Sequence, residues 1–199
     1  MKKTALFSLV VLLLISCKEK TKNTIDFAKE FQYKMNVEFS DSRTSPLTEE
    51  GFSKFKSLDF YPIAPKFRIE ADFKKTPNEK AFKMLTTTSR LVDYKKYGEA
   101  HFVIDDKPYQ LAIYQNVEQF KKDGNDLLFL PFLDLSSGKG SYAGGRYIDL
   151  RIPKKDKIII DFNTAYNPYC AYNHKYSCPI PPSENSLDIA ILAGVKKYH

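Results

Sequence analysis

The chain has few of the residues and motifs on which common catalytic mechanisms depend. Its 199 residues include three histidines and no Gly-x-Ser-x-Gly motif, so the sequence offers no recognisable serine–histidine–aspartate triad. It also has no block of five like charges, and its formal net charge of +7 is spread as single lysines among acidic residues. Because nucleic-acid binding requires a basic stripe or patch, this distribution argues against a nucleic-acid partner.

Tryptophan, low-complexity tracts and internal repeats are absent as well. A chain of 199 residues without a linker-like break is long enough for one well-packed domain and too short for two. Tyrosine and phenylalanine are abundant, with 13 and 15 residues, and this aromatic richness favours β-sheet over helix.

The N-terminus is expected to be a targeting segment rather than part of the fold. Residues 1–16 combine two lysines with an apolar stretch, Ala5 to Ile15, which is typical of a signal peptide. The stretch is shorter than the roughly 20 residues of a membrane span. It ends in Leu14-Ile15-Ser16-Cys17, which resembles the bacterial lipobox.

From this we expect cleavage before Cys17 and lipidation of that residue, with residues 17–24 as a polar tether and residues 25–199 as a single globular domain. The membrane would then be a partner through the lipid. The predicted location is the cell envelope, either at the outer membrane or at the periplasmic face of a membrane. A simple secretory signal with an incidental cysteine is the alternative.

Two cysteines remain in the predicted domain, Cys170 and Cys178. An even pair in an oxidising compartment is typical of a disulfide. The alternative is a metal site that adds His174, since the spacing Cys-x3-His-x3-Cys places three ligand types close together. That spacing is unusual for zinc and no fourth ligand is evident, so we expect a disulfide, no metal and no cofactor.

The beginning of the domain is predicted to be helical. Residues 24–39 carry Phe27, Phe31 and Met35 at intervals of four, which indicates one apolar helix face. A second short helix is expected near residues 45–50, where Pro46 precedes acidic residues.

The rest of the chain changes to short apolar–polar alternation, which is typical of strands. A hairpin turn is expected at Asp105 to Pro108, and Pro131 marks an edge strand or a bent strand. Together these patterns predict a mainly β (α+β) fold, an antiparallel β-sandwich or barrel of about eight strands with an N-terminal helical cap. The expected strands are 67–73, 81–87, 99–104, 109–114, 127–135, 147–152, 157–162 and 187–192.

Three stretches resemble the family called domain of unknown function 1684. They are Ser45-Pro46-Leu47 with Phe60-Tyr61-Pro62, the glycine-rich stretch 137–147, and the stretch from Asp161 through Cys170 and Cys178 to Asn185. The resemblance extends from about Asp26 to Lys197. The family has no established activity, so the resemblance implies no reaction, cofactor or substrate.

Four of the eight glycines lie within residues 138–145. Glycine-rich loops can bind phosphate, but such loops normally open onto a helix, and here Arg146 begins an alternating strand. We therefore expect the glycines to supply positive φ angles in a tight connection. They would also leave room for a neighbour or a ligand, with Arg146 as a fork for a carboxylate or phosphate.

Polar residues gather around the same region. We take as candidate binding or catalytic residues Arg146, Asp149, Asp161, Asn163, Tyr166, Asn167, Glu184 and Asn185. These residues are open to three interpretations: a pocket for a small molecule or glycan, a hydrolase-like enzyme that uses Asp161 and Glu184, or a structural or assembly protein without a pocket. An open concavity shared by Arg146, Asp161 and Glu184 would favour the first two, and buried, mutually paired side chains would favour the third. The sequence does not decide whether the protein is an enzyme.

Overall fold

The computed structural model describes residues 3–198, with side chains from residue 22 onward. The α-helices are α1 (Lys3–Ser40), α2 (Glu49–Lys54) and α3 (Val117–Asp123). The short 3₁₀ helix η1 (Pro65–Phe67) precedes the first strand, and three more follow the last strand: η2 (Phe162–Thr164), η3 (Tyr169–Ala171) and η4 (Ser183–Asn185). The strands are β1 (Arg68–Lys75), β2 (Ala81–Met84), β3 (Val92–Ile104), β4 (Lys107–Asn116), β5 (Leu127–Phe132), β6 (Arg146–Arg151) and β7 (Lys157–Asp161).

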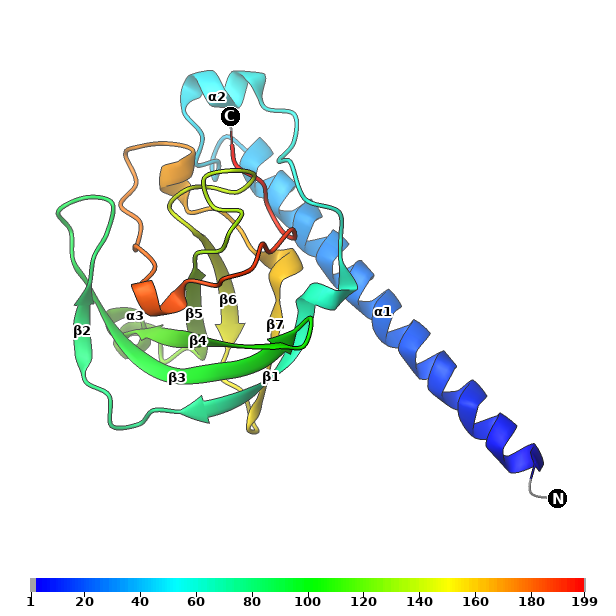
Figure 1. Ribbon diagram of the computed structural model, residues 1–199. Helices are drawn as coiled ribbons and strands as arrows, with labels where there is room; N and C mark the ends of the chain where they lie inside the picture. Colours follow the sequence, from blue (N-terminus) through cyan, green and yellow to red (C-terminus); the bar gives the residue numbers. More distant parts are fainter. Residues whose placement is uncertain (1–2, 199) are drawn as a thin grey trace.

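All strands join one antiparallel sheet in the order β6-β5-β4-β3-β1-β7, with β2 paired to β3 beside this path. The sheet curls into a half-barrel, and the later part of the chain lies in its hollow (Figure 1). The mainly β, antiparallel prediction is therefore confirmed in outline. Within the described residues the sheet has seven strands rather than eight, and it does not form a sandwich.

The expected eighth strand, residues 187–192, is irregular. Its apolar side chains Leu187 and Ile191 are buried as a strand's would be. Its backbone, however, bonds to the loop after β5: Leu187 N–H donates to Leu133 O, and Ile191 N–H donates to a carboxylate oxygen of Asp134. Because the Asp134 side chain, and not a neighbouring strand, accepts from Ile191 N–H, residues 187–192 form no regular hydrogen-bond ladder.

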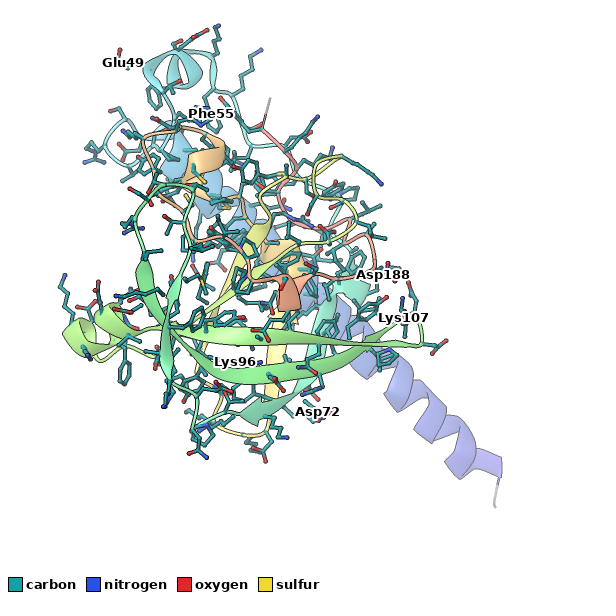
Figure 2. All side chains as sticks on the ribbon, turned by 60° about the vertical axis from the view of Figure 1, so that its left-hand side comes forward. Glu49, Phe55, Asp72, Lys96, Lys107 and Asp188 are labelled. Carbon is teal, nitrogen blue, oxygen red and sulfur yellow. The ribbon has the colours of Figure 1, made fainter. Side chains whose placement is uncertain are left out.

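The hairpin of β3 and β4 is the longest in the sheet. Its turn lies at Asp105 and Asp106, both with positive φ (49° and 61°), and Lys107 beside it donates to Asp188 at 2.8 Å (Figure 2). β3 begins at Val92, earlier than expected, because a bulge between Lys96 and Gly98 hides its alternation.

Helix α1 packs its C-terminal half against the domain and extends away from it toward the N-terminus (Figure 1). Ala28, Met35 and Phe39 are buried, whereas Phe27, expected on the same face, is 51% exposed. The helix continues through the predicted signal peptide and tether, but the side chains up to residue 21, Cys17 included, lie outside the described residues. Among the described residues no helix is both long and apolar enough to cross a membrane.

Strand β5 is not an edge strand, because it lies between β4 and β6. Its backbone is paired to β4 only at Phe129, opposite Tyr114, and the two strands diverge where Pro131 lacks an N–H donor. The amide of Asn185 enters this gap and donates to Pro131 O at 2.7 Å. The proline thus opens the sheet where a later segment inserts.

Residues 165–180, here called the strap, connect two parts of the sheet that are far apart in the chain (orange in Figure 1). At one end, Tyr166 exchanges two backbone hydrogen bonds with Tyr147 of β6, at 2.9 and 3.0 Å. At the other end, Thr87 N–H donates to Cys178 O at 2.9 Å, just beyond β2. The strap therefore covers the outer edge of β6 and extends the sheet beside β2.

Candidate functional site

Arg146, the first residue of β6, is completely buried. Its guanidinium donates to the backbone carbonyls of Ile191 (2.8 Å) and Ala193, and its Nη2 lies 3.4 Å from Asp134 Oδ2. Burial lowers the pKa of Arg146, and Asp134 acts in the opposite direction. Of the two roles that the sequence left open for this guanidinium, a contact to a ligand or to a neighbouring part of the chain, the structure has the second.

Asp134 is the acidic partner that the sequence did not identify. Its side chain is 1% exposed and accepts from the hydroxyls of Ser136 and Ser137 and from Ile191 N–H at 2.6 Å. Asp134 lies in the loop after β5, and its separation of 12 positions from Arg146 matches no sequence pattern that would predict their pairing. Only the folded chain brings them together.

Asp161 and Asn163, at the end of β7, form a second buried cluster. Asp161 Oδ2 accepts from Arg68 at 2.9 Å, and its Oδ1 accepts from the backbone N–H and the amide of Asn163. The Asn163 amide also pairs with both backbone groups of Ala64, accepting from its N–H at 2.8 Å and donating to its carbonyl at 3.1 Å. Asp161 is therefore an ion-pair partner and a cap for η2.

Asn167 and Asn185 have the same kind of role. Asn185 pairs with both backbone groups of Ala112 at 2.8 Å, and Asn167 donates to Lys196 O at 2.8 Å. Both asparagines are 0% exposed. Buried backbone groups outside regular pairing need such partners, so these amides complete the hydrogen bonding of irregular segments.

Glu184 lies elsewhere, in a separate cleft with a volume of about 560 Å³ near β2. Its carboxylate accepts from Tyr114 Oη at 2.6 Å and from Lys96 Nζ at 2.9 Å, while Lys96 also bridges to Glu99 at 2.7 Å. Partial burial acts to raise the pKa of Glu184, but hydrogen bonds from Tyr114 and Lys96 hold it below its ordinary value. A carboxyl group held ionised in this way is poorly suited to protonating a leaving group.

Arg146, Asp161 and Glu184 therefore do not converge. Each has its own partners: Asp134, Arg68 and Lys96, respectively. The two acidic residues expected to act together in a hydrolase lie in different clusters, one buried and one beside an open cleft.

Asp149 and Tyr166 are the two remaining candidate residues, and they meet on the outer side of β6. Tyr166 Oη donates to Asp149 Oδ1 at 3.0 Å. Desolvation by the surrounding side chains raises the pKa of Asp149, and the hydrogen bond from Tyr166 acts against this shift.

Next to this pair is a small open pocket with a volume of about 180 Å³, here called the aromatic pocket. It lies between Tyr147 of β6 and the strap, and its main walls are Tyr147, Tyr166, Pro168, Tyr169, Tyr176 and Pro179. The hydroxyls of three of its tyrosines are already bonded: Tyr147 to Pro179 O, Tyr166 to Asp149 and Tyr169 to Glu38. The pocket consequently offers ring faces and few polar groups.

Cys170 and Cys178 are both free and buried, so the predicted disulfide is not formed in the structure. Their sulfurs lie in one cluster, where Cys170 N–H donates to Cys178 Sγ at 3.1 Å. His174 is exposed between them, and within residues 22–198 no group of three or more His, Cys, Asp or Glu residues is arranged to hold a metal ion.

Comparisons with known proteins agree with this fold. Residues 53–196 match the family described as Protein of unknown function (DUF1684). A solution NMR structure of an uncharacterized protein from Haloarcula marismortui is similar, with a TM-score of 0.71 and 31% sequence identity. The similarity covers 89% of this chain and 96% of that one. No curated protein matches the chain.

Proposed function

The chain belongs to the family of proteins of unknown function DUF1684, and we propose that it is a lipid-anchored envelope protein that binds a ring-containing small molecule, such as a sugar, in the aromatic pocket. One observation carries this proposal: four tyrosine rings line a mostly apolar pocket that opens to solvent. Aromatic rings stack on flat apolar faces, including the C–H face of a sugar ring. Apolar cavities of about 150 Å³ are already large enough for benzene, so this pocket fits a single ring.

The residues that line the pocket all belong to the stretches 137–147 and 161–185, which the sequence singled out by their resemblance to the family. Its rings are held by partners outside it: Tyr147 packs edge-on against Phe129 with ring centroids 4.7 Å apart, and Tyr169 donates to Glu38 of α1. Side chains fixed in this way need little further ordering when a ligand binds, which favours affinity. Asp149 supports the proposal as a nearby acceptor for a ligand hydroxyl.

The test is ligand-observed NMR by saturation transfer, with glucose, N-acetylglucosamine, phenol and indole as probes. We expect at least one probe to bind and its signal to fall by at least about tenfold in a Tyr169→Ala variant, because Tyr169 forms a wall of the pocket yet is 38% exposed. Tyr33→Ala is the matched control, since Tyr33 is 69% exposed on α1 outside the aromatic pocket. If no probe binds, or if both variants lose binding equally, the proposed site is wrong.

Lipid anchoring rests on the lipobox-like sequence that ends in Cys17. Expression of the full chain in a bacterial host with an alkyne-labelled fatty acid tests it. Label and membrane fractionation should both be lost in Cys17→Ser and retained in Cys170→Ser. A label that persists without Cys17 would contradict the anchor.

We also propose that Cys170 and Cys178 form a disulfide when the protein resides in an oxidising compartment. The support is their shared position inside the strap, where the backbone N–H of one lies 3.1 Å from the sulfur of the other. Mass spectrometry of the protein purified without reductant should show a linked peptide pair. Two alkylatable thiols under those conditions would refute the bridge.

A further inference from the structure

The cleft beside Glu184, here called the charged cleft, is distinct from the aromatic pocket, because the two share no lining residue. It is bordered by residues 78–82, which lead into β2, by Lys96 and Tyr114 of the sheet, and by Pro182 and Glu184 at η4. Its volume of about 560 Å³ lies within the usual range for small-molecule sites. The charged cleft is therefore a second place at which this chain can take up a ligand.

The Glu184 carboxylate is held in place and still accessible. Tyr114 Oη donates to one of its oxygens at 2.6 Å, and Lys96 Nζ donates to the other at 2.9 Å (Lys96 is labelled in Figure 2). The side chain nevertheless remains 47% exposed. Each carboxylate oxygen can accept a further hydrogen bond. Glu184 is therefore a preorganised acceptor for a positively charged group of a ligand.

An aromatic wall lies in the same cleft. Phe82 of β2 is 38% exposed, and its ring packs edge-on against the buried ring of Tyr114, with the ring centroids 5.8 Å apart. Tyr114 thus supports both the ring of Phe82 and the carboxylate of Glu184. Exposed apolar surface of this kind favours a ligand with an apolar part, and the face of the ring also attracts an ammonium group.

The charges that line the cleft are balanced. Two lining residues are acidic, Glu79 and Glu184, and two are basic, Lys80 and Lys96. Lys96 is already shared by two carboxylates, since its Nζ lies 2.9 Å from Glu184 and 2.7 Å from Glu99. The side chain of Lys80 is exposed and makes no hydrogen bond or ion pair within the described part of the chain. Lys80 is therefore the cation of the cleft that is free to bind a ligand carboxylate.

We propose that the charged cleft binds a free α-amino acid with an apolar side chain. The ammonium group of the amino acid donates to Glu184, its carboxylate accepts from Lys80, and its side chain packs against Phe82. A cationic ligand without a carboxylate would leave Lys80 unpaired. An anionic ligand without an ammonium group would lie close to the Glu184 carboxylate, at an electrostatic cost. A zwitterion with an apolar part is the class of ligand that matches all three groups.

Three probes test this in the wild-type protein: L-leucine, N-acetyl-L-leucine, which has no ammonium group, and L-leucinamide, which has no carboxylate. At about pH 6.5 the amine of L-leucinamide is protonated. In NMR titrations we expect L-leucine to shift the backbone amide signals of Phe82, Lys96 and Glu184. Each blocked probe should bind at least about tenfold more weakly, because each lacks one charge-assisted hydrogen bond. No binding of L-leucine, or equal binding of a blocked probe, would overturn the proposal.

Two variants assign the ends of the ligand. Glu184→Gln should weaken the binding of L-leucine at least about tenfold and abolish its preference over N-acetyl-L-leucine. Lys80→Gln should abolish the preference over L-leucinamide. Glu79→Gln is the matched control, because Glu79 is exposed at the same cleft, and it should change the affinity less than about twofold. A preference that persists in Glu184→Gln, or an equal loss in Glu79→Gln, would refute the assigned contacts.

The outcome is separate from that of the aromatic pocket. Tyr169→Ala, which removes a wall of that pocket, should leave the binding of L-leucine unchanged, because Tyr169 does not line the charged cleft. Loss of L-leucine binding in Tyr169→Ala would instead place the amino acid in the aromatic pocket and refute the charged cleft as its site.

Discussion

The side-chain amide of Asn185 hydrogen-bonds both backbone groups of Ala112, with both distances 2.8 Å, and so takes the place of a neighbouring strand. The same amide also donates to Pro131 O. One side chain thereby joins β4 and β5 where the two strands diverge.

Asn185→Ala should lower the free energy of unfolding by about 3 kcal/mol, because it leaves three buried backbone groups without a partner. Urea denaturation followed by circular dichroism measures the change. Asn78→Ala is the control, since Asn78 lies exposed in the turn before β2 and should change stability by less than about 0.5 kcal/mol. Similar denaturation midpoints for the two variants would show that the amide is not the strand partner described above.

Arg146→Lys should be destabilising by about 3 kcal/mol, because a lysine cannot reproduce the fork that bonds two carbonyls and Asp134. Arg151→Lys, in the same strand, tests an exposed ion pair with Asp126 and should cost less than about 1 kcal/mol. Thermal unfolding of both variants gives the comparison. A stable Arg146→Lys protein that loses ligand binding would instead return Arg146 to the role of a ligand contact.

Gly145→Ala should be more destabilising than Gly124→Ala, although both glycines have positive φ, 87° and 57°. A methyl group at position 145 would lie 2.6 Å from Phe132 O, whereas no atom lies within 4 Å of one at position 124. We expect a loss of more than about 2 kcal/mol for Gly145→Ala and about 1 kcal/mol for Gly124→Ala. Equal losses in chemical denaturation would mean that the loop can move away from β5.

Acid should weaken the cluster around Glu184. Its pKa is lower in the folded chain than its ordinary value of 4.5, so its contribution to stability is present above that value and is lost as the pH falls through the folded value. Glu184→Gln should therefore reduce the decrease in stability between about pH 5 and pH 3. Glu118→Gln on α3 is the control for an exposed change of the same kind. Parallel stability curves for wild type and Glu184→Gln would contradict this contribution.

The sequence predicted most strands because apolar–polar alternation reports burial on one side of a sheet. It failed at residues 187–192 for the same reason: Leu187 and Ile191 are buried, but their backbone bonds to a loop and to Asp134. Apolar–polar alternation shows which side chains are buried, but it does not show which groups hydrogen-bond to the backbone of the segment. In β3 the bulge at Lys96 and Gly98 broke the alternation and concealed the first part of a strand.

The sequence pointed to polar residues that form ordered clusters in the fold, but it could not predict which of them contact one another. Asp161 and Asn163 bond to each other where β7 passes into η2, and Tyr166 reaches Asp149. No spacing rule could place Glu184 beside Lys96, because 88 positions separate them in the chain. The polar cluster of the sequence is therefore several clusters in the fold, and the pocket is lined by tyrosine rings of β6 and the strap, beside Asp149.

The backbone carbonyls of Ile191 and Ala193, which accept from Arg146, belong to a segment outside the seven strands. If this segment detached from the sheet, it would leave the buried guanidinium without these two acceptors, at the cost of an uncompensated buried charge. The segment and β6 should therefore open together, as one cooperative unit in hydrogen exchange.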